Sequence, residues 1–188
     1  MRTIITTLLL LVLSIAVRAQ APEGLSQDAH GRYRYVHTVS VPEATKDILY
    51  ERLKSFVVSD LNASDTYINW DETAHDSITT VAFFEFENTP EMHNQVVDCR
   101  AKLEFSNGTA VLKLWGFNYS AIATYGDQSF STPLYRMKGV PDAAQSWIRA
   151  GVEQSLLQLA ARMDALANEQ QPMAAKRATQ RRKSKRHA

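Results

Sequence analysis

A predicted β-hairpin over residues 96–119 constrains the fold of this chain more than any other stretch. Two runs that alternate apolar and polar residues flank Asn107-Gly108. Asn-Gly between such runs is typical of a tight hairpin, because a type I′ turn needs positive φ at both central residues. A two-stranded ribbon is barely stable alone, so we expect the hairpin to belong to a larger sheet.

This turn places Arg100 opposite Trp115 and divides the hairpin side chains between two faces, since successive residues of a strand point to opposite sides. The face predicted to enter the core carries Val97, Cys99, Ala101, Leu103, Phe105, Ala110, Leu112, Leu114, Gly116 and Asn118. The opposite face mixes charged residues with apolar and aromatic ones. Its candidate ligand-binding or partner-binding residues are Arg100, Val111, Trp115, Phe117 and Tyr119.

The first nineteen residues have the pattern of a secretory signal peptide. Arg2 precedes an apolar run at 4–17, and Val17-Arg18-Ala19 is a small-x-small cleavage site. Cleavage after Ala19 would leave 169 residues, which suits one domain with a sizeable core. The sequence therefore predicts a secreted or periplasmic protein with no transmembrane segment after signal removal. An uncleaved membrane anchor is the alternative.

The remaining patterns predict a single α+β domain at 32–168, between a polar leader at 20–31 and a tail at 169–188. Further strands are expected at 33–41, 66–71 and 77–87, and helices with one apolar stripe each at 44–60 and 142–167. The order β-α-β-β-β-β-α gives an antiparallel sheet of five strands, and both helices must bury their stripes on the same sheet face. Residues 124–140 have no period and are expected to form a long loop.

This arrangement resembles a family of secreted Bacteroidota proteins, a domain of unknown function with a TBP-like fold. The resemblance rests on the first-helix segment 44–52, the hairpin core 101–119 and the strand at 33–41, and it covers roughly residues 33–166. It implies a TBP-like fold and an exported location. It implies no activity and no site residues.

The net charge of +1 hides an acidic body and a basic tail. Without the two arginines of the signal and the seven cations of the tail, 12 basic residues stand against 20 acidic ones. This balance argues against a nucleic-acid-binding core. The low hydrophobicity of the tail predicts disorder, and its cations are candidates for binding an anionic surface. They are Lys176, Arg177, Arg181, Arg182, Lys183, Lys185 and Arg186.

The sequence predicts no catalytic residue, metal site or cofactor. It contains no Gly-rich phosphate loop, nucleophile elbow or zinc-binding set. Cys99 is the single cysteine, so no intrachain disulfide can form, and its place on the core face predicts a small buried hydrophobe.

The favoured function is a non-enzymatic, exported binding or interaction module. A protein partner, a glycan or a second copy would bind the mixed hairpin face, because apolar patches of this kind mark interfaces. Two structural alternatives would close that face: the 124–140 loop folding across it, or a cation–π pair between Arg100 and Trp115. The functional alternatives are a small hydrolase using carboxylates at 71–76 or at Glu85 and Glu87, and nucleic-acid or anionic-surface binding through the tail.

Overall fold

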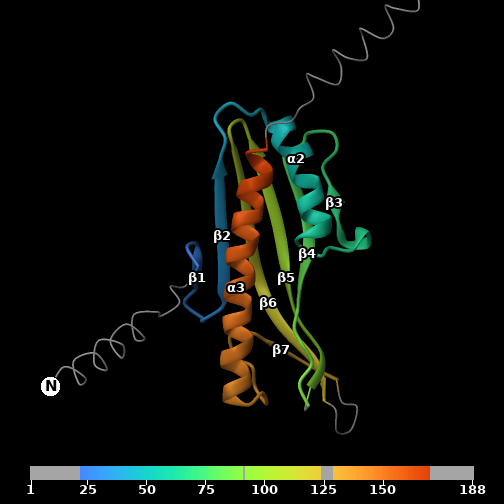
Figure 1. Ribbon diagram of the computed structural model, residues 1–188, viewed down its shortest axis with the longest axis vertical. Coiled ribbons are helices and arrows are strands. Elements are labelled where there is room, and N and C mark those ends of the chain that lie inside the picture. Colours follow the sequence, from blue (N-terminus) through green and yellow to red (C-terminus); the bar gives the residue numbers. More distant parts are fainter. Residues whose placement is uncertain (1–21, 91, 124–128, 170–188) are drawn as a thin grey trace, which may run out of the picture.

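A computed structural model of the protein describes residues 22–90, 92–123 and 129–169, which form one antiparallel sheet with two helices on one face (Figure 1). Seven strands make the sheet, in the order β1-β2-β6-β5-β4-β3, with β7 paired to β6. The elements are β1 (Leu25–Gln27), β2 (Tyr33–Ser40), α2 (Lys46–Ser59), a 3-10 turn η1 (Asp65–Tyr67), β3 (Asn69–Trp70), β4 (Ser77–Glu85), β5 (Met92–Ser106), β6 (Thr109–Ala123), β7 (Ser129–Pro133) and α3 (Asp142–Ala167).

The predicted α+β class, the antiparallel sheet and the placement of both helices on one face are confirmed, but the sheet has two more strands than expected. β1 lies inside the predicted polar leader and pairs with β2, with Leu25 opposite Tyr35. β7 lies inside the predicted 124–140 loop and pairs with β6. Both strands are too short for alternation to show, and pairing with a long neighbour holds them in place. The predicted strand at 66–71 is reduced to η1 and the two residues of β3.

The tip of the central hairpin docks on the start of α2, although its turn differs from the predicted one. Gly108 has a φ of +76°, whereas Asn107 keeps negative φ, so the turn is not type I′. The side-chain oxygen of Asn107 instead accepts a hydrogen bond from the backbone amide of Lys46 at 3.0 Å. Thr45 caps the same helix end, as its residue type favours, by accepting the Ile48 amide on its hydroxyl.

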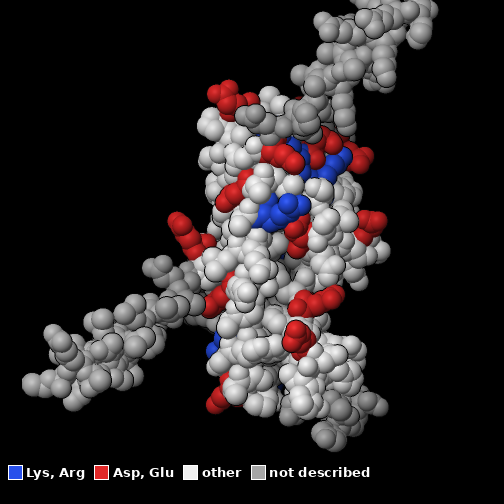
Figure 2. Space-filling view, viewed as in Figure 1, with Lys and Arg blue, Asp and Glu red and all other residues white. Residues whose placement is uncertain are grey.

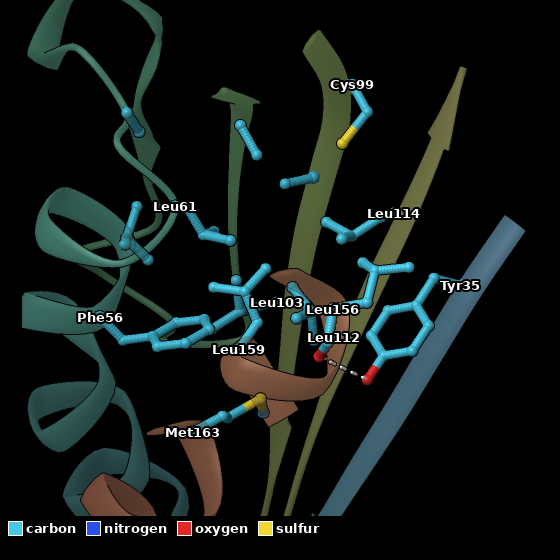
Figure 3. Close-up of a cluster of buried hydrophobic side chains, with 14 of the residues drawn as sticks. Tyr35, Phe56, Leu61, Cys99, Leu103, Leu112, Leu114, Leu156, Leu159 and Met163 are labelled. Carbon is cyan, nitrogen blue, oxygen red and sulfur yellow. Dashed lines mark hydrogen bonds between the residues drawn. The ribbon is translucent and has the colours of Figure 1, made fainter. Parts of the chain in front are cut away.

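The core lies between the helices and the sheet (Figure 3). Leu103, Leu112 and Leu114 of the hairpin are buried there with Leu53 of α2 and Leu159 of α3. The whole predicted stripe of α3 is buried, namely Ile148, Val152, Leu156, Leu159, Met163 and Leu166.

The α2 stripe differs from the sequence prediction, whereas Cys99 agrees with it. The apolar spacing within 44–60 predicts a buried stripe of Ile48, Leu49, Leu53, Phe56 and Val57, but Ile48 is 41% exposed and Tyr50 is buried with the other four. Cys99 is buried, as expected, and this burial raises the pKa of its thiol.

Residues 129–140 extend the sheet edge rather than covering the second face. β7 continues the sheet beside the distal half of β6, where Ser131 stands opposite Ser120. The chain that follows sends Leu134, Met137 and Val140 into the core. In the described part of the chain, the sheet face opposite the helices therefore has no covering layer (Figure 1).

Candidate functional site

The candidate site is the open face, which we define as the side of β2, β4, β5 and β6 that points away from α2 and α3. Strand alternation assigns residues to it, since buried positions strictly alternate with less buried ones along β4 and the first half of β6. The predicted pairing of Arg100 with Trp115 is present in the structure. Arg100, Val111 and Trp115 therefore lie on the open face, as the hairpin pattern predicts.

Phe117 and Tyr119 do not belong to the open face, and their predicted placement is wrong. The pairing of β5 with β6 shifts by one residue after Trp115, so that Asp98 faces Asn118 and Val97 faces Tyr119. Gly116 provides the extra residue of this β-bulge, with a φ of +70° that side chains rarely tolerate. A one-residue slip exchanges the two faces of a strand, so the bulge turns both aromatic rings into the core and Asn118 outward.

The two rings form part of the packing that ties β6 to its neighbours. Phe117 is 4% exposed, and its ring stacks against that of Phe84 with centroids 6.4 Å apart. Tyr119 is fully buried, and its hydroxyl donates a hydrogen bond to Oε1 of Gln95 at 2.7 Å. Burial raises the pKa of the Tyr119 phenol. These residues stabilise the fold and are not available to a partner.

Trp115 lies in the middle of a row that crosses three strands of the open face. Arg34 of β2 is its partner on one side, and Arg100 of β5 is its partner on the other. Trp115 is absent from the core cluster and lines an open depression of about 330 Å³ together with Arg34, Val36 and Lys113. Val36 adds an apolar side chain that is 45% exposed.

The cation–π pair considered between Arg100 and Trp115 is not formed. The cation–π contacts among the described residues involve Lys54 and Arg136, and none involves the Trp115 ring. Arg100 is exposed and forms no ion pair or side-chain hydrogen bond with the described residues. Among the described residues, Arg34 pairs with Asp28 alone, at 3.9 Å, and its side chain is 61% exposed.

A second row beside Trp115 carries two more cations, and these are partly neutralised. Lys113 and Lys102 face each other across β6 and β5, and both bind the carboxylate of Glu104. Hydrogen bonds from Lys113 and then Lys102 hold the pKa of Glu104 below its usual value, against a smaller opposing effect of burial. Nearer the bulge, burial raises the pKa of Asp98 although a hydrogen bond from Asn118 lowers it.

The carboxylates considered for a hydrolase have separate structural partners. Asp71 accepts the Ala74 amide in a turn, and His75 lies 2.8 Å from Asp47 of α2. Asp76 pairs with Lys46 at 2.6 Å. Within the described ranges, no group of three or more potential ligand side chains is placed to hold a metal.

Glu85 and Glu87 are both exposed. Glu85 accepts a hydrogen bond from Asn62 at 3.1 Å, and the Glu87 carbonyl accepts one from the Gln95 side chain. The first contact ties the loop after α2 to the end of β4, and the second lies within the β4–β5 connection. Glu85 lines an open depression with Asn88 and Asn94, and Glu87 is not among the residues that line it.

Arg34, Val36 and Lys113 were not among the predicted site residues, although the exposed Arg34 and Val36 alternate with the buried Tyr35 along β2. The missing information was the pairing of β2 with β6, two strands far apart in the sequence. The tail cations and the signal peptide lie outside the described residues. In the described part of the chain, no helix is both long and apolar enough to cross a membrane.

Comparison with known proteins places the fold. No protein-family model and no curated protein matches the chain. A crystal structure of a TBP-like protein from Parabacteroides distasonis is similar, with a TM-score of 0.60 and 9% identity over 77% of this chain and 97% of that one. A DUF4468 family protein from Bacteroides ovatus is also similar, with a TM-score of 0.53 and 9% identity over 81% and 95%. These structures confirm the resemblance to Bacteroidota domains of unknown function with a TBP-like fold. At this identity they show the fold alone.

Proposed function

We propose that this protein is an exported, non-enzymatic module that binds a ligand or partner on the open face of its sheet. The observation that carries the proposal is the uncovered row of Arg34, Trp115 and Arg100 beside an open depression. Tryptophan and arginine are the residues that binding surfaces favour, because each combines a large flat contact area with directional polar groups. Their strands are each paired on both sides, so the backbone under the row is already ordered before a ligand binds.

Export is the second part of the proposal and rests on the sequence of residues 1–19. Expression with this segment, followed by fractionation and N-terminal sequencing, tests it. Export predicts a product that begins at Gln20 outside the cytoplasm. A full-length product in the cytoplasm would contradict this part alone.

The test of the open face compares two tryptophans. Wild type, Trp115→Ser and Trp147→Ser are screened against one array of neutral glycans, acidic glycans and peptides. Trp147 is 42% exposed on α3, away from the open face, and serves as the matched control. We expect a bound ligand to be lost from Trp115→Ser and retained by Trp147→Ser, while both variants keep wild-type circular dichroism. Binding that survives in Trp115→Ser would contradict the use of this face.

The basic tail supports a further contact of a less specific kind. Residues 170–188 carry seven Lys and Arg and no acidic residue, so they would attract an anionic surface over a long range. A chain ending at Gln171 should lose binding to anionic vesicles, and raising salt should release the full chain. Equal retention of both chains would show that the tail is not responsible.

A further inference from the structure

We infer that the row of Arg34, Trp115 and Arg100 binds an acidic sugar, with the sugar ring on the indole and its carboxylate on an arginine. This inference rests on the proposed use of the open face and names the ligand class. Three observations support it: the indole is partly exposed, the flanking arginines keep free hydrogen-bond donors, and nearby carboxylates limit the cationic area.

The Trp115 indole offers its surface to a ring-shaped ligand. It is partly exposed, lies outside the core cluster and lines the depression with Val36. The negative face of an aromatic ring attracts the positively polarised C–H groups of a sugar. Because the depression is open to solvent, a sugar bound there can belong to a longer chain.

The arginines on both sides of Trp115 add a requirement for negative charge. They lie two strand spacings apart, roughly 10 Å, with the indole between them. Arg100 has no ion-pair partner among the described residues. Asp28 is held by Arg32 at 2.6 Å and is only 3.9 Å from Arg34, so Arg34 keeps donor capacity. A guanidinium recognises a carboxylate through two parallel hydrogen bonds, which gives direction as well as attraction.

Acidic residues elsewhere on the molecule restrict the positively charged area to the neighbourhood of the row of Arg34, Trp115 and Arg100. The helix side, which Figure 2 shows, carries more acidic than basic residues. On the open face, Glu104 offsets one of the two positive charges of Lys102 and Lys113, and Asp98 lies close to the bulge. Charge complementarity therefore favours a ligand that presents its carboxylates beside a ring.

A single-stranded nucleic acid fits this face less well. Its bases stack on successive aromatic rings, and its phosphates need a continuous cationic groove. Trp115 is the one aromatic residue in the two cationic rows, which otherwise hold Arg34, Arg100, Val81, Val36, Lys113, Lys102 and Thr79. Beyond these rows the chain would meet Glu104 on one side and Asp98 on the other, and the next aromatic residue on this face, Phe83, stands directly beside Asp98.

The experiment uses the full chain and tri-galacturonate as the probe. Its fully methyl-esterified form keeps the rings but has no charge, and an oligothymidylate tests nucleic acid. Affinities are measured by calorimetry at low salt for wild type, Arg34→Gln, Arg100→Gln and Trp115→Ala. Arg136→Gln is the control, because Arg136 is exposed and lies over Tyr135, outside the row. The tail is identical in all these chains, so a difference between variants reports the open face.

We expect each Arg→Gln change in the row to remove about tenfold of the affinity for the acid, and the ester, which lacks the charge that both arginines recognise, to bind about a hundredfold more weakly than the acid. Trp115→Ala should weaken both the acid and the ester, whereas Arg136→Gln should change neither. Equal binding of acid and ester, or an equal loss in Arg136→Gln, would overturn the inference. Tighter, Trp115-dependent binding of oligothymidylate would replace the acidic sugar with nucleic acid.

The proposed function can survive a failure of this inference. If tri-galacturonate does not bind, but another ligand of the array binds wild type and not Trp115→Ser, then the ligand class is wrong and the assignment of the binding face is supported. If no ligand depends on Trp115, both proposals fail.

Discussion

Phe117→Ala should destabilise the protein far more than Trp115→Ala, although the two residues are separated only by Gly116. Truncation of a buried phenylalanine costs about 3–5 kcal/mol, because apolar contacts are lost and a cavity remains. Phe117 is 4% exposed, stacks on Phe84 and lines a small cavity with Leu134 and Val152. Trp115 contributes nothing to the core cluster, so its truncation should cost about 1 kcal/mol or less.

Urea unfolding followed by far-ultraviolet circular dichroism measures this difference without depending on tryptophan fluorescence. With a slope of about 2 kcal/mol per molar urea, Phe117→Ala should lower the midpoint by about 1.5–2.5 M, and Trp115→Ala by about 0.5 M or less. If Phe117→Ala does not fold, Phe117→Leu provides a milder version of the same change. Equal shifts for the two positions, or a larger shift for Trp115→Ala, would refute the bulge at Gly116 and with it the assignment of the open face.

Three further predictions concern single side chains of the fold. Tyr119→Phe should lower the free energy of unfolding by about 1–3 kcal/mol, because it leaves the buried Gln95 oxygen without its hydroxyl donor. Tyr50→Phe should be nearly neutral, because the buried Tyr50 hydroxyl has no partner among the described residues. Urea midpoints of the two variants test the difference. Since burial raises the pKa of Cys99, iodoacetamide at pH 8 should label it only after unfolding, and rapid labelling of the native protein would contradict its buried position. Burial raises the pKa of Asp28, but hydrogen bonds from the Arg32 amide, the Arg32 side chain and the His30 amide outweigh this effect and lower it from 3.8 to about 2. A carboxyl group whose pKa is lower in the folded than in the unfolded protein stabilises the folded state at any pH above its unfolded pKa. Asp28→Asn should therefore speed hydrogen exchange in β1 at neutral pH, and the difference from wild type should vanish as the pH falls through about 2. A difference in exchange that persists below that pH would contradict this role.

Local patterns in the sequence were enough to predict the helices and most of the sheet. Thr45 is a residue type that caps helices, and it does so here. The stripe of α3 repeats every three to four residues and is buried throughout. Gly151 lies within that helix where a Cβ would stand 2.5 Å from a ring carbon of Phe86, so the glycine allows the helix to pack closely against the residue that follows β4.

The candidate site was only half predictable, for two physical reasons. Alternation assigned Trp115 correctly, but it was counted through Gly116 as if the strand were regular. A glycine inside a strand is itself a signal of a bulge, and including it would have placed Phe117 in the core. Arg34 was missed as a neighbour of Trp115 because β2 and β6 are distant in the sequence, and alternation within each strand does not determine which strands pair.

The most direct test of the open face is hydroxyl-radical footprinting of the full chain, with oxidation at each aromatic residue read by mass spectrometry. The structure predicts that Trp115 is oxidised at a rate near that of the partly exposed Trp147, while Phe117 and Tyr119 are protected until the protein unfolds. Protection of Trp115 to the level of Tyr119 would show that this face is covered in the complete protein and would contradict the account.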